Sequence, residues 1–200
     1  EGFTDYSEVL FVDCQYGKQA GDAYAQGLRQ NIRNDIPIIG KYGVNQEGSG
    51  DMYAKGANML HSIRQVIDND ELFRQVLRGL NKEFYHRTID SKDVEAYMIR
   101  ESKKDLSKIF DQYLRTIQIP VLEYKYTKKD NSDSYYLQFR WTNCVPGFNM
   151  PLKIKFADAF VWIQPETEFK TVAVSAEQYN SMPKELTIDN NFYIKSKRLN

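Results

Sequence analysis

The sequence predicts an α+β protein in which helices come first and strands follow. Apolar residues recur at helical spacing up to Ile119, and they alternate with polar residues from Val121 onward. The order is a further observation, because a run of helices followed by a run of strands is typical of two segregated units. We therefore expect an N-terminal α-helical bundle at residues 1–119 and a small antiparallel β-sandwich at residues 120–200.

The first unit is expected to hold about six helices packed in chain order. Residues 3–33 show helical periodicity with a break between Gly17 and Gly21. Residues 35–50 include Pro37 and four glycines, which predicts a long loop, and such loops are more often functional than idle. Further helices are expected to begin near Asp51, after the turn at 68–70, at the cap 88–91 and at Asp105.

The second unit is expected to hold short strands. Residues 121–126 and 135–141 alternate around the polar turn 129–133, which predicts a hairpin. Trp141 and Trp162 lie in alternating segments, so we expect both to fill the core of the sandwich. Further strands are expected at 152–156, 160–164, 167–174, 185–188 and 192–197.

Charge and hydropathy exclude several classes of protein. The 27 basic and 27 acidic residues balance, and basic clusters such as Lys195–Arg198 are short, so no nucleic-acid partner is expected. No apolar run approaches the roughly eighteen residues that a transmembrane helix needs. The first residues resemble no signal peptide and lack an initiator Met, so we expect a piece of a longer protein, and the compartment stays open.

Metal-binding motifs made only of this chain's own residues are not expected. The two cysteines cannot form a disulfide scaffold or a zinc knuckle. The two histidines, His61 and His86, match no metal-ligand spacing, and the sequence has no HExxH pair. Two stretches nevertheless follow a specific pattern. They are Glu1–Tyr6, which reads EGFTDY, and Asp51–Leu60, which reads DMYAKGANML.

Both stretches resemble zinc aminopeptidases of the M1 family, which are thermolysin-like gluzincins. In that family two histidines of an HExxH helix and a downstream glutamate in a segment close to N-E-G-F-A bind the catalytic zinc. By this resemblance Glu1 is the carboxylate ligand. A Y-x-K-G-A segment then supplies a tyrosine that points at the scissile carbonyl, and Tyr53 holds that place in Tyr53–Ala57. The resemblance covers residues 1–122 and weakens in the strands.

The resemblance also implies what the chain does and lacks. The parent protein would use Zn²⁺ to hydrolyse the N-terminal peptide bond of peptide substrates. The HExxH histidines and the general-base glutamate would lie upstream of Glu1, so the upstream half of the catalytic domain is an expected partner. Because one carboxylate cannot hold zinc alone, we expect the fragment itself to be metal-free and inactive. By the same resemblance, an exported parent, periplasmic or secreted, is plausible.

Two residues beside Tyr53 carry their own expectations. Gly56 lies in the first turn of a helix, where glycine is unfavourable, so we expect close backbone contact with a neighbouring element. That element would be the metal-bearing helix. Lys55 is expected to be solvated.

Two alternatives to an enzyme stay open. The strand-rich half could be a non-catalytic carbohydrate-binding module in which exposed aromatic rings stack on sugars. The chain could also be a non-catalytic, protein-binding member of the same fold.

Overall fold

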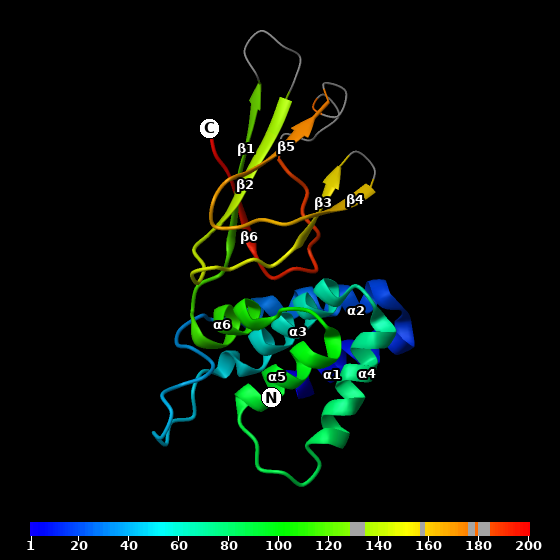
Figure 1. The fold of residues 1–200 in the computed structure, drawn as a ribbon. Coiled ribbons are helices and arrows are strands. Elements are labelled where there is room, and N and C mark those ends of the chain that lie inside the picture. The colour runs from blue at the N-terminus through cyan, green and yellow to red at the C-terminus, as the bar shows by residue number, and fades with distance from the viewer. Residues whose placement is uncertain (129–134, 157–158, 176–178, 180–184) are drawn as a thin grey trace. The chain divides into compact units, whose positions relative to one another are not determined.

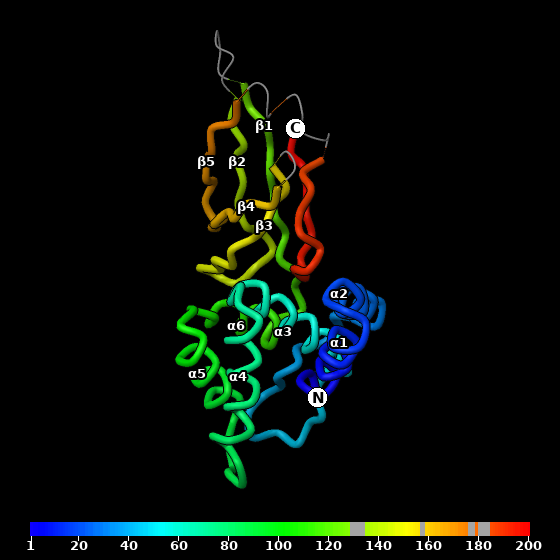
Figure 2. Tube along the Cα trace, turned by 90° about the vertical axis from the view of Figure 1, so that its right-hand side faces the viewer, coloured from blue at the N-terminus to red at the C-terminus, as the bar shows by residue number. Residues whose placement is uncertain are grey.

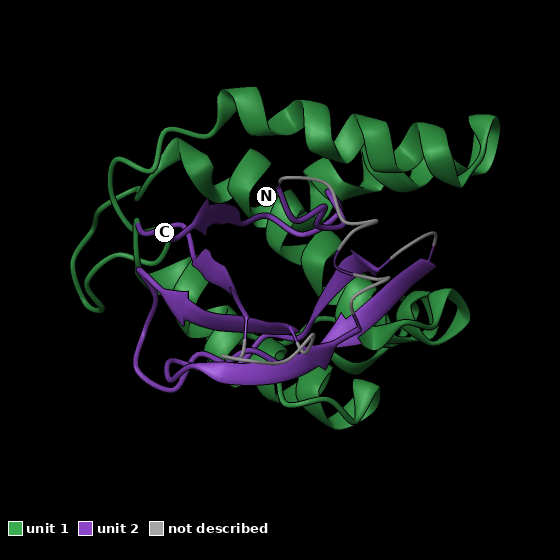
Figure 3. Cartoon of the chain, turned by 90° about the horizontal axis from the view of Figure 1, so that it is seen from above, with its two compact units in different colours: residues 1–117 green, residues 118–200 purple. Residues whose placement is uncertain are grey.

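Helices and strands occupy separate halves of the chain in the computed structural model (Figure 1). The structure describes residues 1–128, 135–156, 159–175, 179 and 185–200. The chain forms two compact units, Glu1–Ile117 and Gln118–Asn200 (Figure 3). The first unit is helical and the second is built of strands, which confirms the predicted α+β class.

The first unit is organised around helix α3 (Ala54–Ile67), which is buried along its whole length. Helix α3 contacts α1, α2, α4 and α6. Figure 2 shows α1 and α2 on one side of α3 and α4, α5 and α6 on the other. The other helical elements are α1 (Gly2–Tyr16), α2 (Lys18–Gly27), η1 (Leu28–Asn31), η2 (Gly50–Met52), α4 (Asp70–Glu83), α5 (Ser91–Ser102) and α6 (Ser107–Arg115).

Local sequence signals set the helix ends. Gly17 separates α1 from α2 with φ of 91°, in the left-handed region that glycine adopts without strain, as the predicted break requires. The Asn69 side chain accepts a hydrogen bond from the Leu72 amide at the start of α4. Asp90 and Asp93 form a reciprocal capping box at the start of α5.

Asp51 does not cap a helix as predicted. Its buried carboxylate accepts hydrogen bonds from the backbone amides of Arg33 and Asn34 at 2.8 and 2.7 Å. The short turn η2 is capped instead by Ser49, whose hydroxyl accepts from the Asp51 amide. Asp51 thus ties the beginning of the long loop to its end, and α3 begins three residues later at Ala54.

The second unit contains two sheets. A four-stranded sheet has the order β5-β2-β1-β6, and β3 pairs with β4. Strand β6 runs parallel to β1, so the larger sheet is mixed rather than purely antiparallel as predicted. A parallel neighbour needs a long connection, which the segment between β5 and β6 supplies. The strands are β1 (Val121–Lys128), β2 (Tyr135–Thr142), β3 (Leu152–Phe156), β4 (Ala159–Ile163), β5 (Lys170–Val174) and β6 (Lys195–Arg198).

The structure bears on two further predictions for the second unit, the hairpin and the strand at 185–188. The predicted hairpin is present as the antiparallel pair β1–β2, but its turn at 129–133 lies outside the described residues. The strand predicted at 185–188 is reduced to a single bridge between Ile154 and Ile188. The segment still forms a backbone hydrogen bond with β3, in which the Lys155 amide donates to the Thr187 carbonyl.

The two tryptophans have different environments. Trp141 is buried, packs edge-on against Phe148 and donates its indole N–H to the Met150 carbonyl at 3.1 Å. Trp162 is 41% exposed, so the prediction that both fill the core is wrong. It lies on β4, which has a single strand partner among the described residues and therefore little cover. The Lys153 ammonium lies 4.6 Å from the centre of its ring, where a sugar would stack.

Candidate functional site

Glu1 and Tyr53 occupy equivalent places in two neighbouring helices. Glu1 is exposed and directly precedes α1, and its carbonyl accepts from the Asp5 amide at 2.9 Å. Tyr53 directly precedes α3, is 45% exposed, and its carbonyl accepts from the Ala57 amide at 2.8 Å. Both side chains are therefore accessible at helix starts.

The first turns of α1 and α3 meet backbone to backbone. A Cβ atom on Gly56 would lie 2.9 Å from the Cα atom of Gly2, and a Cβ atom on Gly2 would lie 2.9 Å from the Cα atom of Gly56. Real Cβ atoms essentially never approach that closely. The close backbone contact predicted for Gly56 is thus confirmed, with α1 as the partner, while packing against a helix that bears metal ligands stays a prediction. It brings the segments that carry Glu1 and Tyr53 side by side.

Gly56→Ala is expected to lower the free energy of unfolding by about 1–3 kcal/mol, because the added methyl group forces two backbones apart. Urea unfolding followed by circular dichroism measures the change. Gly27→Ala is the matched control, since no heavy atom lies within 4 Å of its Cβ position and its φ is −62°. That variant should be about 0.4–1 kcal/mol more stable than the wild type. Equal stability of both variants would contradict the contact.

Lys55 is buried rather than solvated. Its Nζ atom donates a hydrogen bond to the Thr116 carbonyl at 2.7 Å, just beyond the end of α6. Burial lowers the pKa of its ammonium, and the nearby Asp51 carboxylate opposes that effect. The expectation that Lys55 is solvated is wrong because every residue of α3 is buried, so a charged side chain in its first turn has no access to solvent. Lys55 anchors α3 to the end of α6.

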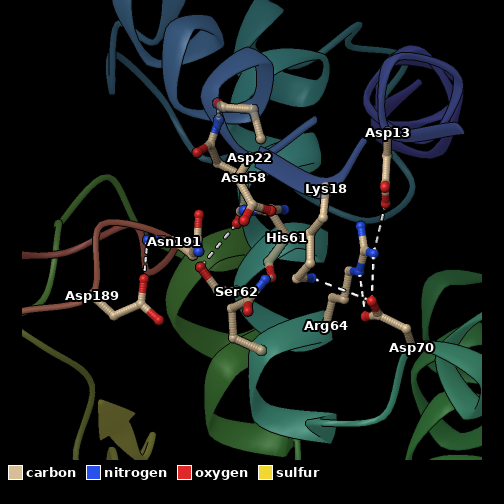
Figure 4. A network of polar contacts seen from close by, with 12 residues as sticks. Asp13, Lys18, Asp22, Asn58, His61, Ser62, Arg64, Asp70, Asp189 and Asn191 are labelled. Carbon is tan, nitrogen blue, oxygen red and sulfur yellow. Dashed lines mark hydrogen bonds and ion pairs between the residues drawn. The ribbon is translucent and has the colours of Figure 1, made fainter. Parts of the chain in front are cut away.

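A buried polar chain joins α1, α2 and α3, and Figure 4 shows its members His61 and Asp22. The Tyr6 hydroxyl lies 3.0 Å from Nδ1 of His61, and Nε2 of His61 lies 3.6 Å from the Asp22 carboxylate. Tyr6 and His61 are fully buried, and burial raises the pKa of the Tyr6 phenol, so it stays neutral. The His61 side chain of α3 therefore links α1 and α2 through its two ring nitrogens.

Arg64 forms a second link between the helices (Figure 4). Its Nη2 atom lies 2.7 Å from the Asp13 carboxylate, and its Nε and Nη2 atoms bind the two Asp70 oxygens at 2.7 and 2.8 Å. This bidentate pairing holds the pKa of the Asp70 carboxyl well below its usual range. Arg64 is 2% exposed and Asp13 is 9% exposed, so a desolvated ion pair fixes α1 to α3. The pair with Asp70, which is partly exposed, fixes α4 to α3. With the Gly2–Gly56 contact, the two networks position Glu1 relative to Tyr53.

Asp5 lies one helical turn after Glu1. Its Oδ2 atom is buried and has no hydrogen-bond partner among the described residues. Burial raises the pKa of this carboxyl, and the neighbouring Glu8 carboxylate adds to the effect. An unpartnered carboxylate oxygen is costly to bury. This atom is therefore a place where a donor from another polypeptide segment would be favourable.

The described residues do not form a complete metal site. No group of three His, Cys, Asp or Glu side chains in them is placed to hold a metal ion. Catalytic zinc sites use three protein ligands. The side chain of Glu1 makes no hydrogen bond or ion pair within the described part of the chain, so it is available as one ligand. The donor set fits zinc as one carboxylate of three ligands.

None of the helices in the described residues is both long enough and apolar enough to span a bilayer.

Comparison with known proteins shows a shared fold. No protein-family model and no curated protein matches the chain. Among solved structures, the chain is similar to aminopeptidase A of Legionella pneumophila in complex with aspartic acid, with a TM-score of 0.70 and 14% sequence identity. The match covers 98% of this chain and 23% of that protein. The chain thus has the fold found in about a quarter of the aminopeptidase's length.

Proposed function

We propose that the chain is part of the catalytic region of a zinc-dependent aminopeptidase of the M1 type. The reaction is hydrolysis of the first peptide bond of a peptide substrate. One observation carries the proposal: the first turns of α1 and α3 are in backbone contact, and exposed Glu1 and Tyr53 stand at their starts. The fold shared with an aminopeptidase supports it.

Glu1 is the residue of this chain that would hold the metal. Two imidazole ligands and the general-base carboxylate would come from the remainder of the protein. When bound, zinc supplies an activated water as nucleophile and polarises the substrate carbonyl. The buried Asp5 oxygen supports this assignment, because ligating histidines usually donate their second ring N–H to a carboxylate.

Tyr53 would stabilise the charge that develops on the substrate. A tyrosine phenol is a neutral hydrogen-bond donor at pH 7, so it can donate to the oxyanion of the tetrahedral intermediate. Its position before α3 leaves the side chain exposed, whereas the backbone at Met52 and Gly56 is held against α1. A fixed backbone limits the reorganisation that the donor must undergo when the oxyanion forms.

A carbohydrate-binding module is the weaker candidate. The exposed Trp162 would be its natural platform, but the Lys153 ammonium already covers a face of that ring.

Glu1→Gln in the full-length protein is expected to weaken zinc binding by at least about tenfold, because a neutral amide replaces a charged ligand. Dialysis against graded chelator followed by metal analysis measures the affinity. Glu71→Gln, at an exposed glutamate of α4, is the control and should retain zinc as the wild type does. Chelation should abolish hydrolysis of aminoacyl amides, and added Zn²⁺ should restore it. Unchanged zinc content in Glu1→Gln would refute the ligand assignment.

A further inference from the structure

An apolar cavity of about 210 Å³ lies in the first unit and is lined in part by Glu1. Its walls come from α1, from the long loop, from the turn before α3, and from α3, α5 and α6. Apolar side chains on these walls include Phe3, Ile38, Met52, Met59, Val94 and Phe110.

The charges around the cavity are uneven. Glu95 also lines it, but Arg115 binds both Glu95 oxygens at 2.7 and 3.2 Å. Glu1 has no such partner among the described residues. The cavity is therefore an apolar chamber with one uncompensated carboxylate, and that carboxylate is the proposed zinc ligand.

The size of the cavity selects its occupant. It is too large for a single water, which takes about 30 Å³, and smaller than the about 300–1,000 Å³ of a site for a whole drug-sized ligand. An apolar cavity of about 150 Å³ stays dry and binds benzene. A space of 210 Å³ thus suits one aliphatic or aromatic side chain. A larger hollow of 670 Å³ between α1 and α4 is not lined by Glu1.

We propose that this cavity receives an apolar side chain of the peptide substrate, of the size of leucine or phenylalanine. The inference rests on the proposed function, and it adds the substrate class to it. An acidic side chain would lose its hydration in the chamber and would find no free cation there, since Arg115 is already paired with Glu95. A basic side chain would find only the Glu1 carboxylate, which the proposed function assigns to zinc. A short side chain such as that of alanine would leave the space unfilled.

The first test measures substrate preference. The full-length protein is assayed with p-nitroanilides of leucine, phenylalanine, alanine, aspartate and lysine. The leucine and phenylalanine substrates should have kcat/KM values about tenfold or more above those of the others, since each methylene in an apolar pocket contributes about tenfold or more. A preference for alanine, aspartate or lysine overturns the inference.

A matched pair of variants locates the preference in the cavity. Val94→Phe adds a ring to the wall, and Val12→Phe makes the same exchange at another half-buried helical valine that does not line the cavity. Val94→Phe should lower kcat/KM about tenfold for the leucine and phenylalanine substrates and leave the alanine substrate nearly unchanged. Val12→Phe should change none of them. An equal loss for all substrates in Val94→Phe overturns the inference.

A binding measurement separates the cavity from the proposed reaction. Met52 and Met59 line the cavity and Met98 and Met150 do not, so ¹³C-methyl NMR of methionine reports on its occupation. Adding 3-methylbutylamine should shift the first two signals and leave the other two in place. Hydrolysis without these shifts refutes the cavity and leaves the enzyme proposal standing. Shifts without any hydrolysis support the cavity's ligand class and refute the enzyme.

Discussion

Tyr53→Phe is expected to lower kcat of the full-length protein by about a hundredfold or more, with little change in KM. The exchange removes one hydroxyl group and keeps the ring, so binding of the substrate in its ground state should be nearly unaffected. The lost hydrogen bond forms fully only when the substrate carbonyl becomes an oxyanion, and therefore the effect falls on the chemical step. Steady-state kinetics with an aminoacyl p-nitroanilide measure both constants.

The control for this prediction is Tyr42→Phe. Tyr42 is a fully exposed tyrosine in the loop that leads to Tyr53, so loss of its hydroxyl should leave kcat unchanged. A Tyr53→Phe variant with wild-type kcat would remove Tyr53 from the reaction. A proportional rise in KM alone would instead assign it to substrate binding.

Arg64→Met is expected to lower the free energy of unfolding by about 3–5 kcal/mol, because it leaves the Asp13 carboxylate in the core without its cation. Asp13 is 9% exposed and Arg64 is 2% exposed, so water cannot replace the lost partner. Asp70 is 39% exposed and contributes less to the loss, since solvent can compensate it. Thermal and urea unfolding of the protein measure the change.

Lys18→Met tests the same network at its surface. Lys18 pairs with Asp70 at 3.3 Å, but its side chain is 51% exposed, so the loss should stay below about 1 kcal/mol. If both variants lost the same stability, the buried pair would have no special role. An Arg64→Met protein as stable as the wild type would contradict the role given to the buried pair of Arg64 and Asp13.

Local rules predicted the parts of the fold that depend on a few neighbouring residues. The break at Gly17 needs a residue that tolerates positive φ, and the start of α5 needs the Asp90 capping box, and both are visible in the sequence. The strand pairing of β1 with β2 follows in the same way from alternation around a polar turn.

Features that depend on distant segments escaped prediction. Asp51 has the residue type and place of a helix cap, but it binds amides that lie 17 and 18 residues earlier. Trp162 alternates like a core residue, and only the pairing of β4 with a single strand among the described residues explains its exposure. In both cases the deciding partner is remote in the sequence.

The candidate site was predictable only in part. Glu1 and Tyr53 were found through short motifs, and their assignment stays a proposal. The polar residues that join the helices were missed, because Arg64 and His61 on a helix look like surface residues until the neighbouring helices are placed. One signal was present, since α3 follows a glycine-rich loop and carries apolar residues over most of its length.

Hydrogen bonds hold the two ends of the long loop together, so the length of the loop does not determine the geometry of the site. Asp51 holds the amides of Arg33 and Asn34, and the Ser49 hydroxyl donates to Asp35 at 2.6 Å, whereas residues 40–47 are exposed. Doubling the length of a loop costs only about 0.6 kcal/mol in closure entropy. Residues can therefore be inserted or deleted at the tip while the closing residues keep Tyr53 in place, so the loop can vary in length without moving the proposed oxyanion donor.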